Sequence, residues 1–445
     1  MPGGVVLQEL LSFLTEAIGK AVDPRPGSNK HYSLHDIVMA AFAVFFSQSP
    51  SFLSHQRLMQ QSRGMNNATT MFSIDQLPTD VQIRNVLDKV VPDTWRTVYR
   101  RCFEYLQVQN ALEQFRDFNN TLLVALDGTG YFHSERIHCP GCTVTKHRDG
   151  RTSYTHTVLM AAVVKPDSAQ VVALQPEFIA PQEGHDKQDC ELQAAKRWIA
   201  EVGATYSSQG ITLLGDDIYT CTPIITQAGA EELSFIFVAK PQSHKYLYEE
   251  IHSFEQLGQI QQLSESKTEK SKRRHYHYRF INELSLTNAE DAVPVNWVEL
   301  TVTDDSGKQL YRNAFVTNHM ISSENVAAVV AAGRCRWKIE NEDFNTLKTK
   351  GYHFEHNFGH GSSHLSQTLL SLNIIGFLFH TLLELLDENY ALLREKLPRR
   401  DMFFQHIAAL TQYLCFASWQ SLIQFMLRGI LHGPGPPPDP LSIIE

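Results

Sequence analysis

The order of strand-forming and helical segments between residues 119 and 241 restricts the fold of this chain more than any other feature. Three segments rich in β-forming residues come first, namely TLLVALDGTGYFH, SYTHTVLMAAVV and AQVVALQPEFIA, with the turn signal KPDS between the last two. The helical segment DKQDCELQAAKRWIAEVG follows, and then come the strand GITLLGDDIY, the short helix CTPIITQAGA and the strand LSFIFVAKP. Three strands followed by alternating helices and strands predict an α/β fold with a mixed sheet covered by helices.

The rest of the chain divides into regions that differ in the spacing of their apolar residues and in their content of β-forming residues. Apolar residues recur at helical spacing before and after the predicted core, whereas the segment that holds SESKTEKSKRRHYHYRF and the hairpin sequence WVELTVTDDSGKQLYRNAFVTN is rich in β-forming residues. We therefore divide the chain into an N-terminal helical region (1–118), the first part of the α/β core (119–241), a β-rich insertion (242–322), the end of the core with an acidic helix (323–365), a C-terminal helical region (366–432) and a proline-rich tail (433–445).

Composition narrows the class of protein. The 445-residue chain is 43% hydrophobic, which is enough apolar material for a large core. Its formal net charge of −9 excludes a polybasic nucleic-acid binder, so contact with a polyanion must use local basic patches. Seven cysteines, an odd number, and the absence of a secretory signal indicate a reducing compartment.

One apolar segment, residues 369–386, is nearly long enough to span a bilayer. It contains Asn373, His380 and Glu384, which are costly in lipid. We therefore expect a buried core helix there and no membrane contact.

Acidic residues occur at the ends of the first and fourth predicted strands and on a later helix. Asp127 lies in LLVALDGTG, the pair Asp216 and Asp217 lies in ITLLGDDIY, and Glu340 lies in GRCRWKIENEDFN. In a mixed sheet of this order the first and fourth strands can lie side by side, and a helix crossing that edge can add the glutamate. Such carboxylates suit Mg²⁺ or Mn²⁺, which prefer oxygen ligands. Two of these ions about 4 Å apart can activate the attacking oxygen and stabilise the leaving oxygen of a phosphodiester.

Each acidic residue also has an ordinary structural explanation. An Asp-Gly pair after a strand is a common turn, and an Asp-Asp pair at a strand end can cap a helix. A single glutamate on a helix most often belongs to a solvated face. The order of the three sites along the chain, rather than any one of them, favours the metal hypothesis.

The same segments resemble the DDE transposases of bacterial insertion sequences, in the subgroup with a β-rich insertion and a Y-R-E-K signature. The resemblance covers most of the chain, roughly from Thr79 to Ser418. The matching motifs are VALDGTGYF, the G-D-x-x-Y form of GDDIY, the R-W-x-I-E core of RWKIENEDFNTLK, and GYHFEHNFGHG. The resemblance implies a ribonuclease-H-like mixed sheet with a β-rich insertion, flanked by N- and C-terminal helical regions. It also implies that Asp127, Asp216 and Glu340 are the catalytic acids and the ligands of two Mg²⁺ or Mn²⁺ ions.

The signature fits some positions better than others. Asp216 is preferred to Asp217 because of its spacing to the motif tyrosine, and Arg336 stands four residues before Glu340 as the signature requires. The expected tyrosine three residues before Arg336 is Gly333. The lysine expected seven residues after the glutamate is Leu347, and Lys348 follows it. The resemblance assigns Arg336 and Lys348 to phosphate contacts, and it leaves Glu342 as a second candidate for the third acid.

The implied function is that of a DNA transposase, which cleaves DNA at the element ends and transfers the strands into target DNA. The partners would be double-stranded DNA, as terminal inverted repeats and target, and a second copy of the chain in a synaptic homodimer. Residues 1–118 are expected to bind DNA, and the location would be the bacterial cytoplasm at the nucleoid. Two other functions stay open: a ribonuclease-H-like DNA nuclease without strand transfer, and a domesticated DNA-binding regulator with vestigial acids.

The segment IHCPGCTVTKH contains Cys139 and Cys142 as a C-x-x-C pair, which is a half-site for structural Zn²⁺. A tetrahedral site needs two further ligands, which Cys190 together with His147 or His138 could supply. Reduced thiols in a Pro-Gly turn are the alternative.

The segment KTEKSKRRHYHYRF combines cations, which neutralise phosphates, with aromatic rings, which stack on unpaired bases. A charged strand with one buried face is the alternative. A tryptophan in the hairpin could stack on a base or pack in the core, and a histidine in GYHFEHNFGHG could contact DNA or belong to a structural loop. The candidate DNA-binding residues are Lys272, Arg273, Arg274, Tyr276, Tyr278, Trp297, Arg336, Lys348 and His360.

Overall fold

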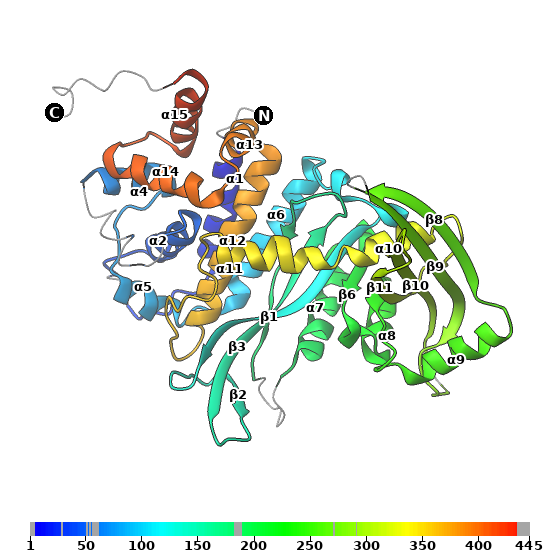
Figure 1. Ribbon diagram of the computed structural model, residues 1–445. Coiled ribbons are helices and arrows are strands. Elements are labelled where there is room, and N and C mark those ends of the chain that lie inside the picture. Colours follow the sequence, from blue (N-terminus) through cyan, green and yellow to red (C-terminus); the bar gives the residue numbers. More distant parts are fainter. Residues whose placement is uncertain are drawn as a thin grey trace. The chain divides into compact units, whose positions relative to one another are not determined.

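We describe the protein from a computed structural model of the 445-residue chain (Figure 1). The structure describes residues 5–27, 30–49, 52, 55, 62–181, 189–269, 272–290 and 292–433. The chain forms two compact units: residues 1–111 with 346–445 (unit 1), and residues 112–345 (unit 2).

Unit 1 is helical and draws on both ends of the chain. Helix α2 is buried from Asp36 to Phe46 and packs on α12, so that the rings of Phe42 and Phe379 lie 5.3 Å apart. The N- and C-terminal helical regions, which the sequence separates, therefore share one core. The described helices of this unit are α1 (Val5–Lys20), α2 (Leu34–Phe46), α4 (Ser62–Phe72), α5 (Asp80–Leu87), the 3₁₀ helix η1 (Pro92–Trp95), α6 (Arg96–Val108), α11 (Asn345–Thr349, which begins at the unit boundary), α12 (Leu365–Leu386), α13 (Glu388–Lys396), α14 (Arg400–Tyr413) and α15 (Trp419–His432).

Helix α12 is the one described helix that is long and apolar enough to cross a membrane, but 83% of its most apolar window is buried within the protein. Its polar side chains have protein partners. His380 Nε2 lies 2.8 Å from the carbonyl oxygen of Phe46, and Asn373 donates to the carbonyl of Tyr352. Glu384 pairs with arginines that follow it in the chain. These contacts are those of a core helix, as the sequence predicts.

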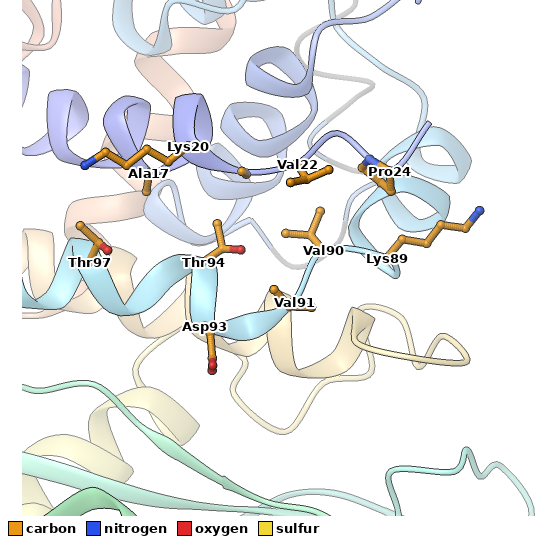
Figure 2. Close-up of a pocket in the computed structure, with 11 residues that line it drawn as sticks. Ala17, Lys20, Val22, Pro24, Lys89, Val90, Val91, Asp93, Thr94 and Thr97 are labelled. Carbon is orange, nitrogen blue, oxygen red and sulfur yellow. The ribbon is translucent and has the colours of Figure 1, made fainter. Parts of the chain in front are cut away.

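Unit 1 also has a hollow of about 450 Å³ where the end of α1 faces the segment from Lys89 to Thr97. Figure 2 shows a largely aliphatic lining, with Lys20 and Lys89 at opposite ends and Asp93 pointing away from the other labelled side chains. None of the predicted acidic site residues lines this hollow.

The described part of unit 2 is built on one mixed sheet of 11 strands, in the order β2-β3-β1-β6-β7-β11-β10-β9-β8, with β4 and β5 also paired to β3 (Figure 1). This confirms the predicted α/β class. The strands are β1 (Leu122–Ser134), β2 (Thr143–Lys146), β3 (Thr152–Val164), β4 (Val172–Ala173), β5 (Glu177–Ile179), β6 (Ile211–Gly215), β7 (Ser234–Val238), β8 (Gln261–Glu269), β9 (Lys272–Ser285), β10 (Pro294–Asp304) and β11 (Gln309–Thr317).

Helices cover both faces of this sheet. Successive side chains of a strand point to opposite faces. On β7, Ile236 packs beside Gly333 of α10, whereas the ring of Phe237 lies 6.0 Å from that of Tyr219 on the other face. The helical elements of the unit are η2 (Glu113–Phe115), η3 (Phe118–Asn120), α7 (Glu191–Tyr206), η4 (Ser207–Gln209), η5 (Asp217–Tyr219), α8 (Thr222–Ala230), α9 (Lys245–Gln256), α10 (Val326–Arg334) and the π-helical η6 (Ile339–Phe344).

The structure differs from the sequence prediction in three places. AQVVALQPEFIA forms two short strands, β4 and β5, because Pro176 between them has no N–H to donate to a ladder. The acidic helix predicted within residues 323–365 is interrupted after α10 and continues as η6 and α11. The strands of the β-rich insertion extend the core sheet, since β11 pairs with β7, and the predicted β10–β11 hairpin is confirmed.

Gly333 explains one departure from the signature and yields a prediction. A Cβ atom there would lie 2.9 Å from side-chain atoms of both Ile236 and Phe315, so the site has no room for a methyl group and none for the expected tyrosine. We expect Gly333→Ala to destabilise the protein by about 1–3 kcal/mol through overpacking. Thermal or urea unfolding of the full chain measures this change.

The matched control is Gly229→Ala in α8, where an added Cβ meets no atom within 4 Å. Because alanine has the higher helix propensity, this variant should be neutral or more stable by about 0.5–1 kcal/mol. Equal stability of the two variants would contradict the packing described for α10.

Candidate active site

Asp127 lies in the middle of β1, just past the point where the pairing of β1 with the neighbouring strand β6 ends. Leu122 to Leu126 are fully buried, and β1 continues past Asp127 to Ser134, paired with β3. Asp127 itself pairs with Met160 of β3. The Asp-Gly pair is therefore not a turn, and the expectation that the first strand ends there is corrected, because the β1–β3 ladder continues.

The strand register places Asp216 beside Asp127. β1 and β6 lie side by side, as predicted from their order, and they are parallel, with partners from Leu122 and Ile211 to Ala125 and Leu214. Continued by two residues, to one residue past the end of β6, the same register brings Asp216 alongside Asp127, and the charge of Asp216 acts on Asp127.

The two acids of the GDDIY motif have different surroundings. Asp216 caps η5 by accepting a hydrogen bond from the N–H of Ile218 at 2.9 Å, so the capping alternative also holds. Asp217 accepts from the N–H of Lys240 at 2.6 Å and lies 3.1 Å from Nε2 of His244. Of the two, Asp216 is therefore the one that accompanies Asp127.

Arg336 joins the first and third predicted acids. Its Nη1 lies 3.2 Å from Oδ2 of Asp127, and its Nη2 lies 2.6 Å from Oε1 of Glu340. Arg336 and Asp127 are each 19% exposed, while Glu340 is 48% exposed. One guanidinium thus brings a residue of the central sheet and a residue far along the chain to the same place.

The π-helical segment presents Glu340 rather than its acidic neighbours. It is anchored by the buried Lys338, whose Nζ donates to the carbonyl oxygen of Ser168 at 2.6 Å. Asp343 is fully buried, and burial raises its pKa to about 8, so it is largely protonated at neutral pH. Only Glu340, of the three acids in this segment, pairs with Arg336 among the described contacts. Single π-helical turns are often found at functional sites.

Glu191 is a fourth acid of this cluster, and the sequence analysis missed it. It is the first residue of α7, and it accepts a hydrogen bond from the hydroxyl of Tyr219 at 2.6 Å. Its carboxylate lies against Gly128, where any Cβ would collide with it. The motif tyrosine was a possible signal, since burial keeps the pKa of Tyr219 well above its usual range and makes it a donor in need of an acceptor.

Acidic side chains outnumber basic ones in the cluster, so its net charge is negative. Burial raises the pKa of Asp127 to about 7. The charge of Arg336 opposes this shift, and the charges of Glu340, Glu191 and Asp216 add to it. The cluster has four carboxylates and one guanidinium, which pairs with two of them, so it has an excess of oxygen ligands and of negative charge that a divalent cation would neutralise.

The structure does not leave all the predicted DNA-binding residues available. Trp297 is 1% exposed and packs in the sheet, which favours the packing alternative. Tyr276 and Tyr278 are buried and donate hydrogen bonds to Glu269 and Glu265 of the neighbouring strand β8, so their faces are not open to bases.

The cationic candidates have varied surroundings. Lys272 and Arg273 are exposed and Arg274 is half-buried at the start of β9. In unit 1, Lys348 pairs with Glu355 at 2.9 Å, and His360 is half-buried in the loop before α12.

The cysteine pair has a different third partner from the predicted ones. Nε2 of His156 lies 3.5 Å from the sulfur atoms of both Cys139 and Cys142. His147 lies beyond the end of β2 and contacts Oγ of Ser153 at 2.8 Å. Cys190 precedes α7, where it lines a hollow of about 280 Å³ next to the acidic cluster. His138, the other histidine considered, stacks on Tyr154.

No family model matches the chain, and no curated protein matches it. Among solved structures, the chain is similar to piggyBac transposase in a synaptic complex with hairpin DNA. The match has a TM-score of 0.43 and 11% sequence identity, and it covers 98% of this chain and 81% of that one. At this TM-score and identity, the likeness is too weak to show a shared fold or function.

The pKa of Asp127 predicts how stability depends on pH. Because its folded pKa is raised from 3.8 to about 7, the contribution of this group is fully present below pH 3.8 and is lost as the pH rises to about 7. Asp127→Asn keeps the shape of the protonated acid without the charge. In metal-free buffer, the melting temperature of the variant should therefore exceed that of the wild type by more at pH 8 than at pH 5. A difference that does not change with pH would contradict the raised pKa.

Proposed function

We propose that this protein is a DNA transposase of the DDE type, which uses divalent cations to cleave phosphodiester bonds at element ends and to transfer the strands into target DNA. The observation that carries the proposal is the bridge from Arg336 to Asp127 and Glu340, beside an Asp216 aligned by the strand register. The same residues occupy the motif positions of the transposase resemblance.

The topology supports a ribonuclease-H-like core. β1 has an antiparallel partner, β3, on one side and the parallel strands β6 and β7 on the other. Helical elements cover both faces, and the acids lie where β1 and β6 part. Ligand sites of such sheets form beyond the carboxyl ends of parallel strands.

The donor set fits Mg²⁺ or Mn²⁺. We assign Asp127, Asp216 and Glu340 as the ligands, because they offer carboxylate oxygens within one small, negatively charged region. When bound, two such ions would supply Lewis acidity and a more acidic water for phosphodiester cleavage.

The other residues of the cluster have positioning roles. Arg336 fixes the spacing of Asp127 and Glu340 through its two pairs, and its guanidinium could contact a phosphate bound at these acids. Tyr219 holds the Glu191 carboxylate, and Lys338 holds the π-helical segment. The exposed Lys272 and Arg273 are candidates for phosphate contacts outside the cluster.

The remaining assignments come from the resemblance. They are a synaptic homodimer on two DNA ends, DNA binding by residues 1–118, and a place in the bacterial cytoplasm at the nucleoid. Analytical ultracentrifugation with and without end DNA addresses the first of these.

The test uses the full chain and a plasmid that carries its gene with the genomic DNA on both sides, since the terminal repeats lie in that DNA if the proposal holds. With Mg²⁺, the wild type should give excised and strand-transfer products, detected by sequencing the junctions. Asp127→Asn and Glu340→Gln should lower product formation by at least about 100-fold, since loss of outer-sphere partners alone costs 10–100-fold.

Glu342→Gln is the matched control, because it removes the same charge from the same π-helical segment without touching the Arg336 bridge. It should retain the activity of the wild type. Cleavage without strand transfer would instead indicate a nuclease, and binding without cleavage a regulator. Full activity of Glu340→Gln would overturn the site assignment.

A further inference from the structure

A second cluster of ligand side chains lies on the β2 side of the same sheet. Cys139 and Cys142 belong to the connection between β1 and β2, and His156 belongs to β3. Cys142 is 3% exposed and His156 is 2% exposed, while Cys139 is half-buried. The three ligand atoms lie close enough together to hold one metal ion.

The strand register explains why these residues meet. β2 and β3 are antiparallel, and Thr143 pairs with Thr155. One residue further, the same register places Cys142 opposite His156. Directly opposed residues of antiparallel strands have Cβ atoms about 4.5–5.5 Å apart, which lets their side chains share a ligand.

The distances match the edges of a zinc tetrahedron. The two sulfur atoms are 3.9 Å apart, and each lies 3.5 Å from Nε2 of His156. With Zn–S bonds of about 2.3 Å, Zn–N bonds of about 2.05 Å and tetrahedral angles, these edges should be about 3.8 Å and about 3.5 Å.

The surroundings of the cluster fix the ligand atoms. The N–H of Cys139 donates to the sulfur of Cys142 at 3.4 Å. Such a donor stabilises a thiolate. The His156 ring is parallel to that of Tyr131, with centroids 5.5 Å apart, so its orientation is set by packing.

We infer that Cys139, Cys142 and His156 bind one structural Zn²⁺ ion, whose fourth ligand is water or a further donor. Two thiolates and an imidazole suit zinc and do not suit Mg²⁺ or Ca²⁺. Binding replaces the two thiol protons, which pass to solvent. The ion would tie β2, a four-residue and largely exposed edge strand, to its neighbour β3. This site is separate from the acidic cluster and does not depend on the proposed function.

The first test is metal content. The full chain, purified without chelator or added metal, should contain about one zinc per molecule by mass spectrometry of the digested protein. Cys142→Ser and His156→Ala should lose this zinc. Cys190→Ser and His147→Gln, which change the ligands that the sequence alone suggested, should retain it. Zinc retained in both Cys142→Ser and His156→Ala, or absent from the wild type, would overturn the inference.

A second measurement uses the wild type alone, so that it stands even where a variant does not fold. Zinc should protect Cys139 from alkylation, and a strong chelator should raise its rate of modification severalfold, read by peptide mass spectrometry. The exposed Cys190 serves as the internal control and should react equally in both states. No effect of the chelator on Cys139, or a Cys139–Cys142 disulfide in the protein as purified, would show a thiol pair and not a zinc site.

Discussion

One guanidinium group holds the candidate active site together. Arg336 contacts a carboxylate from the middle of the sheet and another from the segment that follows the sheet. Without a cation, Asp127 and Glu340 would repel each other in a partly buried place where charge is poorly screened. Their common position therefore depends on Arg336 in the metal-free protein, and a divalent cation would serve the same electrostatic purpose with more ligands.

Strand pairing in the sheet fixes the position of Asp216 relative to Asp127. Parallel pairing of β1 with β6 sets Asp127 beside Asp216, and the end of β6 opens the edge at which both carboxylates emerge. Glu191, in the first turn of α7, lies at the same place. Its carboxylate accepts a hydrogen bond from the buried Tyr219 and packs against Gly128, which has no side chain to exclude it. Each added carboxylate raises the cost of ionising Asp127, so the region is built to concentrate negative charge. A purely structural site would gain nothing from that accumulation, because paired charges are stabilising only when they balance.

Local patterns in the sequence were enough to predict most strands and helices of the core, the adjacency of β1 and β6, and the hairpin of β10 and β11. They were not enough for contacts that depend on register. In the sequence, Glu191 does not differ from other acidic residues at the start of a helix. His156 does not differ from other polar residues that alternate with apolar ones along the strand SYTHTVLMAAVV. Only the β2–β3 pairing shows that His156, rather than the nearer His147, faces the cysteines. The sequence pattern also did not predict the π-helical segment, since the spacing of its hydrophobic residues differs little from that of an α-helix.

The basic and aromatic segment of the insertion divides into two parts in three dimensions. Its two tyrosines are buried and donate hydrogen bonds to glutamates of β8, and Arg279 pairs with Glu299 of β10. The exposed cations Lys272 and Arg273 remain at the start of β9. Contacts from such residues to DNA are made with phosphates, which increase affinity in a salt-dependent way but carry no sequence information. Under the proposed function, these cations would contact DNA phosphates, and recognition of particular terminal sequences would have to come from other regions of the chain.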